Sequence, residues 1–256
     1  MTVRTLLIAL IGAVIGVAAL ETYYRYGGGG SERTEIQQVI RDYIISHPEL
    51  LQEAMAELEK RQTAADAVKA RDAVKRNETA LFNSPRQAVG GDPKGDVTLV
   101  EFFDYNCPYC KQAQNDLNAL MKSDPKLRVV FKEFPVLGPN SVEAAQVAVA
   151  VRMQDPSGEK YSAYRQALLG GRGQVDKARA LAVAREVGVD FNKLEADLAS
   201  DEIKATLEES FKLAEQLGLN GTPSYVIGSD VIVGAVGLST LKEKVRVARC
   251  TATSSC

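Results

Sequence analysis

The chain is arranged around Val97-Thr-Leu-Val-Glu-Phe-Phe-Asp-Tyr-Asn-Cys107-Pro-Tyr-Cys110-Lys111. Residues 97–103 are mostly apolar, β-branched or aromatic, which predicts a strand buried on both faces. Pro108 suits the first position of a helix, where a backbone N–H would have no partner. Apolar residues then recur at helical spacing until about residue 121. The sequence therefore predicts a strand that leads through two cysteines directly into a helix.

This order of elements favours redox chemistry at the cysteines. Cys107 is expected at the positive end of the helix dipole, among amide donors that have no partner within the helix. That environment stabilises a thiolate, which is the nucleophile in disulfide exchange. Cys110 is three residues further on the same face, so it can form a disulfide with Cys107 or resolve a mixed disulfide. A structural disulfide or half of a metal site is the alternative.

A second motif, Gly221-Thr222-Pro223, lies far from the cysteines in the sequence. With both motifs, residues 97–249 resemble the DsbA-like branch of the thioredoxin superfamily, which contains extracytoplasmic thiol-disulfide oxidoreductases. The resemblance implies that Pro223 forms a cis-proline loop facing the cysteines, whereas Thr222-Pro223 alone would also suit a trans proline at a strand start. It also implies a set of substrate-contacting residues: Pro108, Tyr109, Thr222 and Pro223.

The expected fold class is α/β, a thioredoxin fold with an inserted helical subdomain at about 139–217, preceded by an N-terminal helical stalk. A minimal thioredoxin fold has one helix between its second strand and the cis-proline, and this interval is much longer here, as in DsbA-like proteins. Residues 83–95 are rich in Gly and Pro and predict a loop. The other elements are expected as strands at 97–103, 127–134, 224–228 and 231–236, and as helices at 141–153, 161–169, 174–187, 191–217 and 238–249.

Glu101 is an acid in an otherwise apolar strand. DsbA-like proteins place a buried acid at this position near the resolving cysteine, so the resemblance implies a catalytic role for Glu101. A buried carboxylate has a raised pKa and can take the proton when Cys110 attacks the mixed disulfide. Lys132, in the next predicted strand, is a candidate partner for Glu101. The alternative is that Glu101 faces solvent.

Two further cysteines, Cys250 and Cys256, lie in a small polar tail. In an oxidising compartment they favour a local structural disulfide, and a free or intermolecular pair or a second redox relay is the alternative. A zinc site built from all four cysteines of the chain is not expected, because a closed site needs four converging ligands.

Residues 1–26 predict a signal peptide or an uncleaved signal anchor, because an arginine precedes an apolar run. Tyr23, Tyr24 and Tyr26 favour the anchor, since aromatic residues are enriched at membrane interfaces. Either segment would send the rest of the chain to the periplasm, where a dithiol can cycle and structural disulfides persist. Residues 27–33 are glycine-rich and predict a flexible linker.

Residues 34–82 predict charged helices with an apolar stripe that two short helices cannot bury between themselves. The stripe consists of Ile36, Val39, Ile40, Tyr43, Ile44, Leu50, Leu51, Ala54, Met55 and Leu58. It must pack on the catalytic domain, residues 83–256, or on copies of itself. Residues 35–54 are also similar to the N-terminal segment of ScsC-like proteins, in which chains associate into trimers and the catalytic domains are disulfide isomerases. This resemblance implies a homotrimer.

Composition narrows the function classes. Lys and Arg number 31 against 33 Asp and Glu, so nothing indicates nucleic-acid binding. The single histidine, His47, precedes the cysteines by a long interval and is expected at a helix entry, not beside a nucleophile.

The sequence predicts an oxidoreductase that exchanges disulfides in exported proteins, and it favours an isomerase. A membrane thiol-disulfide protein is the expected redox partner. Apart from the redox-active disulfide, no cofactor is expected. A monomeric DsbA-like oxidase and a copper-binding protein that uses the same cysteines are the alternatives, since thiolates bind copper(I).

Overall fold

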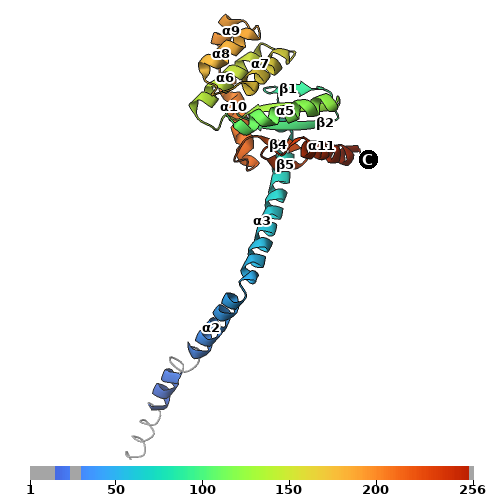
Figure 1. Cartoon of the computed structure of the whole chain (residues 1–256). Helices are drawn as coiled ribbons and strands as arrows, with labels where there is room; N and C mark the ends of the chain where they lie inside the picture. Colours follow the sequence, from blue (N-terminus) through green and yellow to red (C-terminus); the bar gives the residue numbers. More distant parts are fainter. Residues whose placement is uncertain (1–14, 24–29, 254–256) are drawn as a thin grey trace, which may run out of the picture. The chain divides into compact units, whose positions relative to one another are not determined.

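The computed structural model describes residues 15–23 and 30–253 (Figure 1). The chain divides into two compact units, residues 1–63 and residues 64–256. The sequence predicts the boundary near residue 82, and the structure places it earlier. The reason is that Ala73 and Val74, near the end of helix α3 (Glu49–Arg76), are buried in the core of the second unit.

The first unit is helical where it is described. Residues 15–23 are helical, and α2 spans Gly30–Ser46, so a helix begins inside the segment expected to be a linker. Within residues 15–23 and 30–253, no helix is both long enough and apolar enough to cross a membrane. Residues 1–14 and 24–26 of the predicted signal segment lie outside the described residues, so the signal or anchor stays a prediction.

The second unit is built on a five-stranded mixed sheet with the order β1-β3-β2-β4-β5. The parallel strands β2 and β3 lie at its centre, and each of the other neighbouring pairs is antiparallel. This is the thioredoxin-like arrangement that the sequence predicts. The strands are β1 (Ala88–Gly91), β2 (Val97–Phe103), β3 (Leu127–Glu133), β4 (Ser224–Ile227) and β5 (Asp230–Val233).

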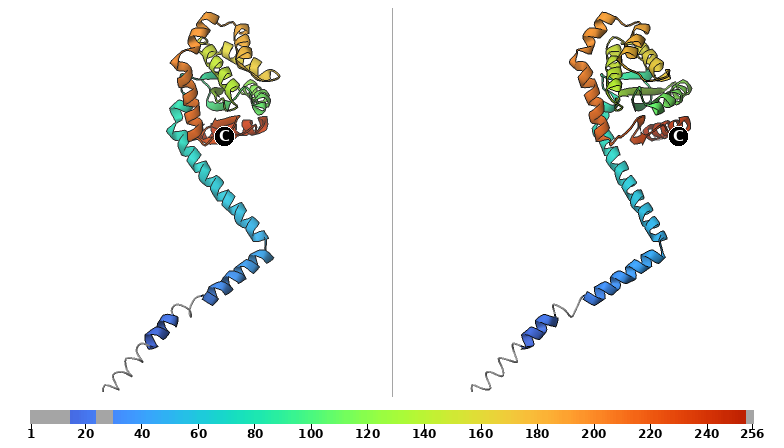
Figure 2. Two further views of the ribbon diagram at one scale, coloured as in Figure 1. Left: turned by 90° about the vertical axis from the view of Figure 1, so that its left-hand side faces the viewer. Right: turned by 60° about the vertical axis from the view of Figure 1, so that its left-hand side comes forward.

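Helices surround this sheet, and α6 to α10 lie between β3 and β4 in the sequence. Figure 1 and Figure 2 show α6 to α9 gathered on one side of the sheet. The insertion expected at about 139–217 also includes α10, some of whose buried residues belong to a different core cluster. The helices are α4 (Glu78–Phe82), α5 (Pro108–Ser123), α6 (Pro139–Met153), α7 (Glu159–Gly170), α8 (Lys177–Glu186), α9 (Phe191–Leu198), α10 (Asp201–Gln216) and α11 (Leu238–Thr253).

The two faces of the sheet pack against different helices, because side chains alternate along β2 and β3. Leu99 and Phe103 of β2 belong to one core with residues of α5, α6, α7 and α11. Val100 and Phe102 belong to a second core with residues of α3, α4 and α10. We call these the α5 face and the α10 face. Both faces of β2 are therefore covered, as its apolar sequence predicts.

The structure corrects two expectations from the sequence. The single helix expected at 191–217 is two helices, α9 and α10, because Ser200 is an extended N-cap residue and two acids occupy the first turn after it, where the helix dipole favours them. The expected loop at 83–95 contains strand β1, although two glycines weaken its strand propensity. Gly91 has φ +69° there, and a Cβ would lie 2.3 Å from the Leu127 backbone oxygen, so the strand ends where only glycine fits.

Candidate active site

Cys107 is placed by the junction of β2 and α5. It is the N-cap residue of α5, with φ −77° and ψ 119°, and Pro108 opens the helix as predicted. Cys107 and Cys110 are both free thiols and both buried. The Cys107 thiol donates to the backbone oxygen of Thr222 at 3.1 Å. The fold thus brings together the two motifs that the sequence singles out.

The two thiols differ in acidity. The hydrogen bond from the Cys110 thiol is the largest cause that lowers the pKa of Cys107 to about 5, and burial acts in the opposite direction. Backbone N–H groups of Cys110 and Tyr109 lower this pKa further. Burial raises the pKa of Cys110 well above its ordinary value, and the hydrogen bond to Cys107 and the charge of Glu101 act in the same direction. At neutral pH the site therefore holds a nucleophilic thiolate beside a protonated thiol.

The acidity of Cys107 gives a direct prediction. The ultraviolet absorbance of the thiolate in the reduced protein is expected to rise with a midpoint near the Cys107 pKa of about 5, and Cys107→Ser is expected to lack this transition. Because this pKa lies below its ordinary value of 9.0, the thiolate stabilises the reduced protein above that value, and the stabilisation is lost as the pH falls through about 5. A midpoint at or above the ordinary value would contradict the assignment.

The residues expected to contact substrate lie around Cys107. The Thr222–Pro223 peptide bond is cis, as the resemblance implies. Pro108 and Tyr109 are exposed, with Tyr109 62% exposed, while Thr222 is half-buried and Pro223 is buried. Exposed Leu137, in the loop after β3, adds an apolar side chain that the sequence analysis missed. Contact of these residues with a substrate stays a prediction.

The loop between β2 and α5 is fixed by polar contacts that the sequence analysis also missed. Asp104 accepts hydrogen bonds from the Asn106 backbone N–H at 2.8 Å and from the Ser141 hydroxyl at 2.7 Å. The Asn106 side chain donates to the Val175 backbone oxygen at 2.9 Å and accepts from the Val175 N–H at 2.7 Å. The Leu137 N–H donates to the second Asp104 oxygen at 3.0 Å. These bonds tie the residues just before Cys107 to the inserted subdomain.

Glu101 is fully buried on the α5 face, as predicted, but Lys132 is not its partner. The parallel register pairs Glu101 with Phe131 and Phe102 with Lys132, so Lys132 points to the opposite face of the sheet. Glu101 instead forms an ion pair with Arg165 of α7. Burial raises the pKa of Glu101, and the positive charge of Arg165 opposes this.

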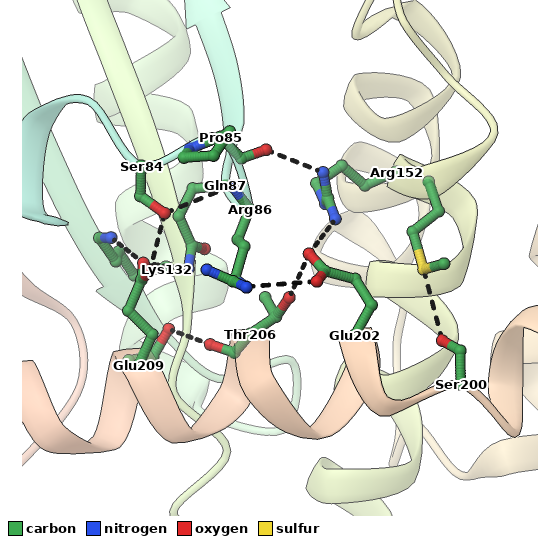
Figure 3. Close-up of polar contacts among 12 residues, drawn as sticks. Ser84, Pro85, Arg86, Gln87, Lys132, Arg152, Ser200, Glu202, Thr206 and Glu209 are labelled. Atoms are coloured by element: carbon green, nitrogen blue, oxygen red, sulfur yellow. Dashed lines mark hydrogen bonds and ion pairs between the residues drawn. The ribbon is translucent and has the colours of Figure 1, made fainter.

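Lys132 belongs to a separate polar cluster on the α10 face (Figure 3). Its ammonium group lies 3.0 Å from the Glu209 carboxylate and donates to the Ala80 backbone oxygen at 2.6 Å. Glu209 also accepts hydrogen bonds from Ser84 and Gln87, which precede β1. The cluster fastens this segment to α10 and is separated from the cysteines by the sheet.

The C-terminal disulfide and metal binding are the two remaining questions about the site. Cys256 lies outside the described residues, so the Cys250–Cys256 disulfide stays a prediction. Within residues 15–23 and 30–253, no group of three or more His, Cys, Asp or Glu side chains is placed to hold a metal ion. Copper binding, which the sequence leaves open as an alternative, has no support among these residues.

A free dithiol at a helix N-terminus, beside a cis-proline loop on a thioredoxin-like sheet, defines the class of thiol-disulfide oxidoreductases. A sequence profile described as the DSBA-like thioredoxin domain matches residues 98–246, more than half of the chain. The chain therefore belongs to the DsbA-like thioredoxin-domain family. A second profile, described as the N-terminal domain of the copper resistance protein ScsC, matches residues 32–65.

Individual relatives agree with this assignment. The chain is similar to a thioredoxin-like oxidoreductase from Silicibacter pomeroyi DSS-3, with 44% identity and a TM-score of 0.64 over 68% of this chain and 98% of that one. It is also similar to a linker-deletion mutant of Proteus mirabilis ScsC, with 28% identity and a TM-score of 0.66 over 88% of this chain and 98% of the mutant.

One curated relative matches over part of its length. The Na(+)/H(+) antiporter NhaA 1 of Salinispora arenicola is 26% identical over 162 residues, which are 62% of this chain and 24% of the antiporter. The chain thus spans about a quarter of the length of this relative. This coverage gives no ground for assigning transport activity to the chain.

Proposed function

We propose that the protein is a periplasmic disulfide isomerase that reshuffles disulfides in exported proteins through Cys107 and Cys110. The observation that carries the proposal is the free Cys107–Cys110 dithiol at the start of α5, beside the cis-proline loop, where the pKa of Cys107 is lowered. Family membership supports thiol-disulfide oxidoreductase chemistry. The isomerase direction rests on the N-terminal segment, which matches the ScsC profile and exposes an apolar stripe.

The chemistry follows from the difference between the two thiols. The Cys107 thiolate attacks a disulfide of the client, forming a mixed disulfide and releasing one client sulfur as a thiolate. That thiolate can attack a different disulfide of the client, which is isomerisation. If the mixed disulfide persists, Cys110 loses its proton and attacks Cys107, which oxidises the enzyme and releases the client reduced. A membrane thiol-disulfide partner would then return the pair to the dithiol form.

The N-terminal segment supports association of several chains. Its apolar side chains are exposed within the first unit, and burying one such side chain is worth about 1.5–3 kcal/mol. Large exposed apolar patches of this kind usually mark an interface. The members with more than half of their surface exposed are Ile36, Val39, Ile40, Tyr43, Leu51, Met55 and Leu58. We propose that three copies bury this stripe together and hold three Cys107 thiolates around one client.

The test compares two activities of the soluble part, residues 31–256. Scrambled ribonuclease measures isomerisation, and reduced ribonuclease measures oxidation. The proposal expects reactivation of the scrambled enzyme by reduced protein, together with a molar mass of three chains by light scattering. Oxidation without isomerisation by a monomer would refute the isomerase and favour a DsbA-like oxidase.

Glu101 gives a second prediction, because we propose that it accepts the proton of Cys110. Glu101→Gln keeps the shape of the side chain but cannot accept this proton. It is expected to slow the attack of Cys110 on the mixed disulfide by roughly 100-fold. The attack of Cys107 on a disulfide is expected to be unchanged, and rapid-mixing kinetics separate the two steps. Equal rates of Cys110 attack in Glu101→Gln and in the unaltered protein would remove Glu101 from the mechanism.

A further inference from the structure

Four side chains on the α5 face form a rhombus across β2 and β3. Glu101 and Phe103 come from β2, and Phe131 and Glu133 come from β3. The parallel register pairs Glu101 with Phe131 and Phe103 with Glu133. Residues two apart point to the same face, so the two phenylalanines occupy one diagonal and the two glutamates the other.

Arg165 of α7 lies over the middle of this rhombus. The Arg165 Cζ is 4.7 Å from the centre of the Phe103 ring and 4.3 Å from the centre of the Phe131 ring. The guanidinium group therefore covers the diagonal between the two carboxyl groups, and it forms the ion pair with Glu101. Arg165, Glu101 and Glu133 are all buried. One buried positive charge thus faces two buried acids.

The Glu133 carboxyl group is hydrogen-bonded to two tyrosines, and its burial favours the neutral, protonated form. One of its oxygens accepts hydrogen bonds from Tyr105 at 3.0 Å and from Tyr161 at 2.7 Å. The other Glu133 oxygen and the second Glu101 oxygen are buried without a hydrogen-bond partner among the described residues. Burial raises the pKa of Glu133 to about 8, and the tyrosine hydrogen bonds and the charge of Arg165 oppose this. Glu133 is therefore mostly neutral below about pH 8, and the ion pair of Arg165 is with Glu101.

We propose that Arg165 and Glu133 are positioning residues that set the basicity of Glu101 in the resolving step. The charge of Arg165 opposes the effect of burial and favours the ionised form of Glu101, which is the form that can accept a proton. Glu133 competes for the same guanidinium group when it ionises, which makes Glu101 a stronger base. This inference rests on the proposed role of Glu101 and deepens it.

The resolving step combines a proton transfer with a thiol-disulfide exchange. The Cys110 thiol gives its proton to the Glu101 carboxylate, and the Cys110 sulfur attacks the Cys107 sulfur. The Cys107–Cys110 bond forms as the bond between Cys107 and the client sulfur breaks. The client sulfur leaves with the electron pair and is protonated by water. The enzyme is oxidised by two electrons and the client is reduced by two.

The pH dependence involves every charged or titratable group that acts on Glu133. Arg165, Tyr161 and Tyr164 come from α7, and Asp104 and Tyr105 come from the loop after β2. Each of the three tyrosines has a pKa raised well above its ordinary value, so all three stay neutral over the range that matters. Asp104 raises the Glu133 pKa and Arg165 lowers it. The three tyrosines are therefore excluded as the source of a titration near pH 8, and the Glu133→Gln variant tests whether Glu133 is the source.

The test uses Ellman's reagent with the reduced soluble protein, residues 31–256. Cys107 attacks the reagent and releases one coloured thiolate, and Cys110 then attacks Cys107 and releases the second. The first phase reports the nucleophile and the second phase reports the resolving step.

Arg165→Met is expected to raise the Glu101 pKa and slow the second phase by about tenfold or more at neutral pH, since one pKa unit changes the ionised fraction about tenfold. The rate is expected to recover at higher pH, and Arg165→Lys is expected to restore part of it at neutral pH.

Glu133→Gln tests the second acid without removing a buried cation. Its second phase is expected to match that of the unaltered protein at neutral pH. Above pH 8, the unaltered protein is expected to gain rate as Glu133 ionises, and Glu133→Gln is expected to lack this gain. Identical pH profiles would overturn the role of Glu133.

Lys132→Met is the matched control, because it also removes a buried cation from an ion pair, but on the α10 face (Figure 3). Both phases are expected to be unchanged in this variant. An equal slowing of the second phase in Lys132→Met and Arg165→Met would overturn the inference, because general destabilisation would then explain both. Loss of the first phase in the unaltered protein would refute the proposed function itself, which separates the two failures.

Discussion

Replacing Cys110 by serine is expected to convert the protein into a trap for its clients. Cys107 keeps its place at the start of α5 and still attacks client disulfides, but the mixed disulfide has no internal thiol to resolve it. Client adducts are therefore expected to accumulate and to be released by added reductant. Non-reducing electrophoresis of cell extracts, followed by mass spectrometry, identifies them.

The control for this trap is Cys107→Ser. This variant is expected to form no adducts, because Cys110 is fully buried and its pKa is raised well above the ordinary value. Its catalysed exchange is expected to fall to the background rate. Adducts of equal abundance in Cys107→Ser and Cys110→Ser would show that the two roles have been assigned wrongly.

Removing residues 1–63 is expected to give a monomer that exchanges disulfides but isomerises poorly. This cut keeps the second unit whole, whereas a cut at residue 82 would remove Ala73, Val74 and Leu81 from the core on the α10 face. Losing the local concentration of several thiols is expected to lower the reactivation of scrambled ribonuclease about tenfold or more. Light scattering and the two ribonuclease assays measure both effects.

A matched variant separates association from the mere presence of the segment. Ile40→Glu with Leu51→Glu keeps the helices but places charges in the exposed apolar stripe. It is expected to behave like the truncated protein in both assays. A truncated or charged variant that isomerises as well as the intact protein would refute the link between the N-terminal segment and isomerisation.

The central elements were predictable because their local signals agree with their place in the fold. Residues 97–103 combine strand propensity with full burial, and Pro108 marks the start of α5. The cis-proline loop was predictable only through resemblance, since its proximity to Cys107 arises from contacts between distant parts of the chain. Strand β1 was missed because Gly90 and Gly91 carry little propensity of their own, and its pairing with β3 supplies the missing stabilisation.

The partner of Glu101 was missed for a different reason. Lys132 was a candidate because it lies in the neighbouring strand, whereas the register of the strands decides which face each side chain occupies. A usable signal was nevertheless present in the helix expected at 161–169. Arg165 follows Tyr161 by four residues and precedes Leu169 by four, so it lies on the apolar face of that helix. A charged residue at such a position needs a buried partner of opposite sign.

The hydrogen bonds that join Asp104 and Asn106 to Ser141 and Val175 of the inserted subdomain limit how segments can be exchanged between members of this family. Exchanging residues 139–217 for the insertion of a relative would change Ser141 and Val175, which hold the backbone just before the nucleophile. In a chimera whose residues 104 and 106 cannot bond to the new insertion, the backbone before Cys107 would lose these contacts. The geometry of Cys107 would then change although residues 107–110 are unaltered. The insertion and the turn that precedes α5 therefore have to be exchanged together in any engineered chimera.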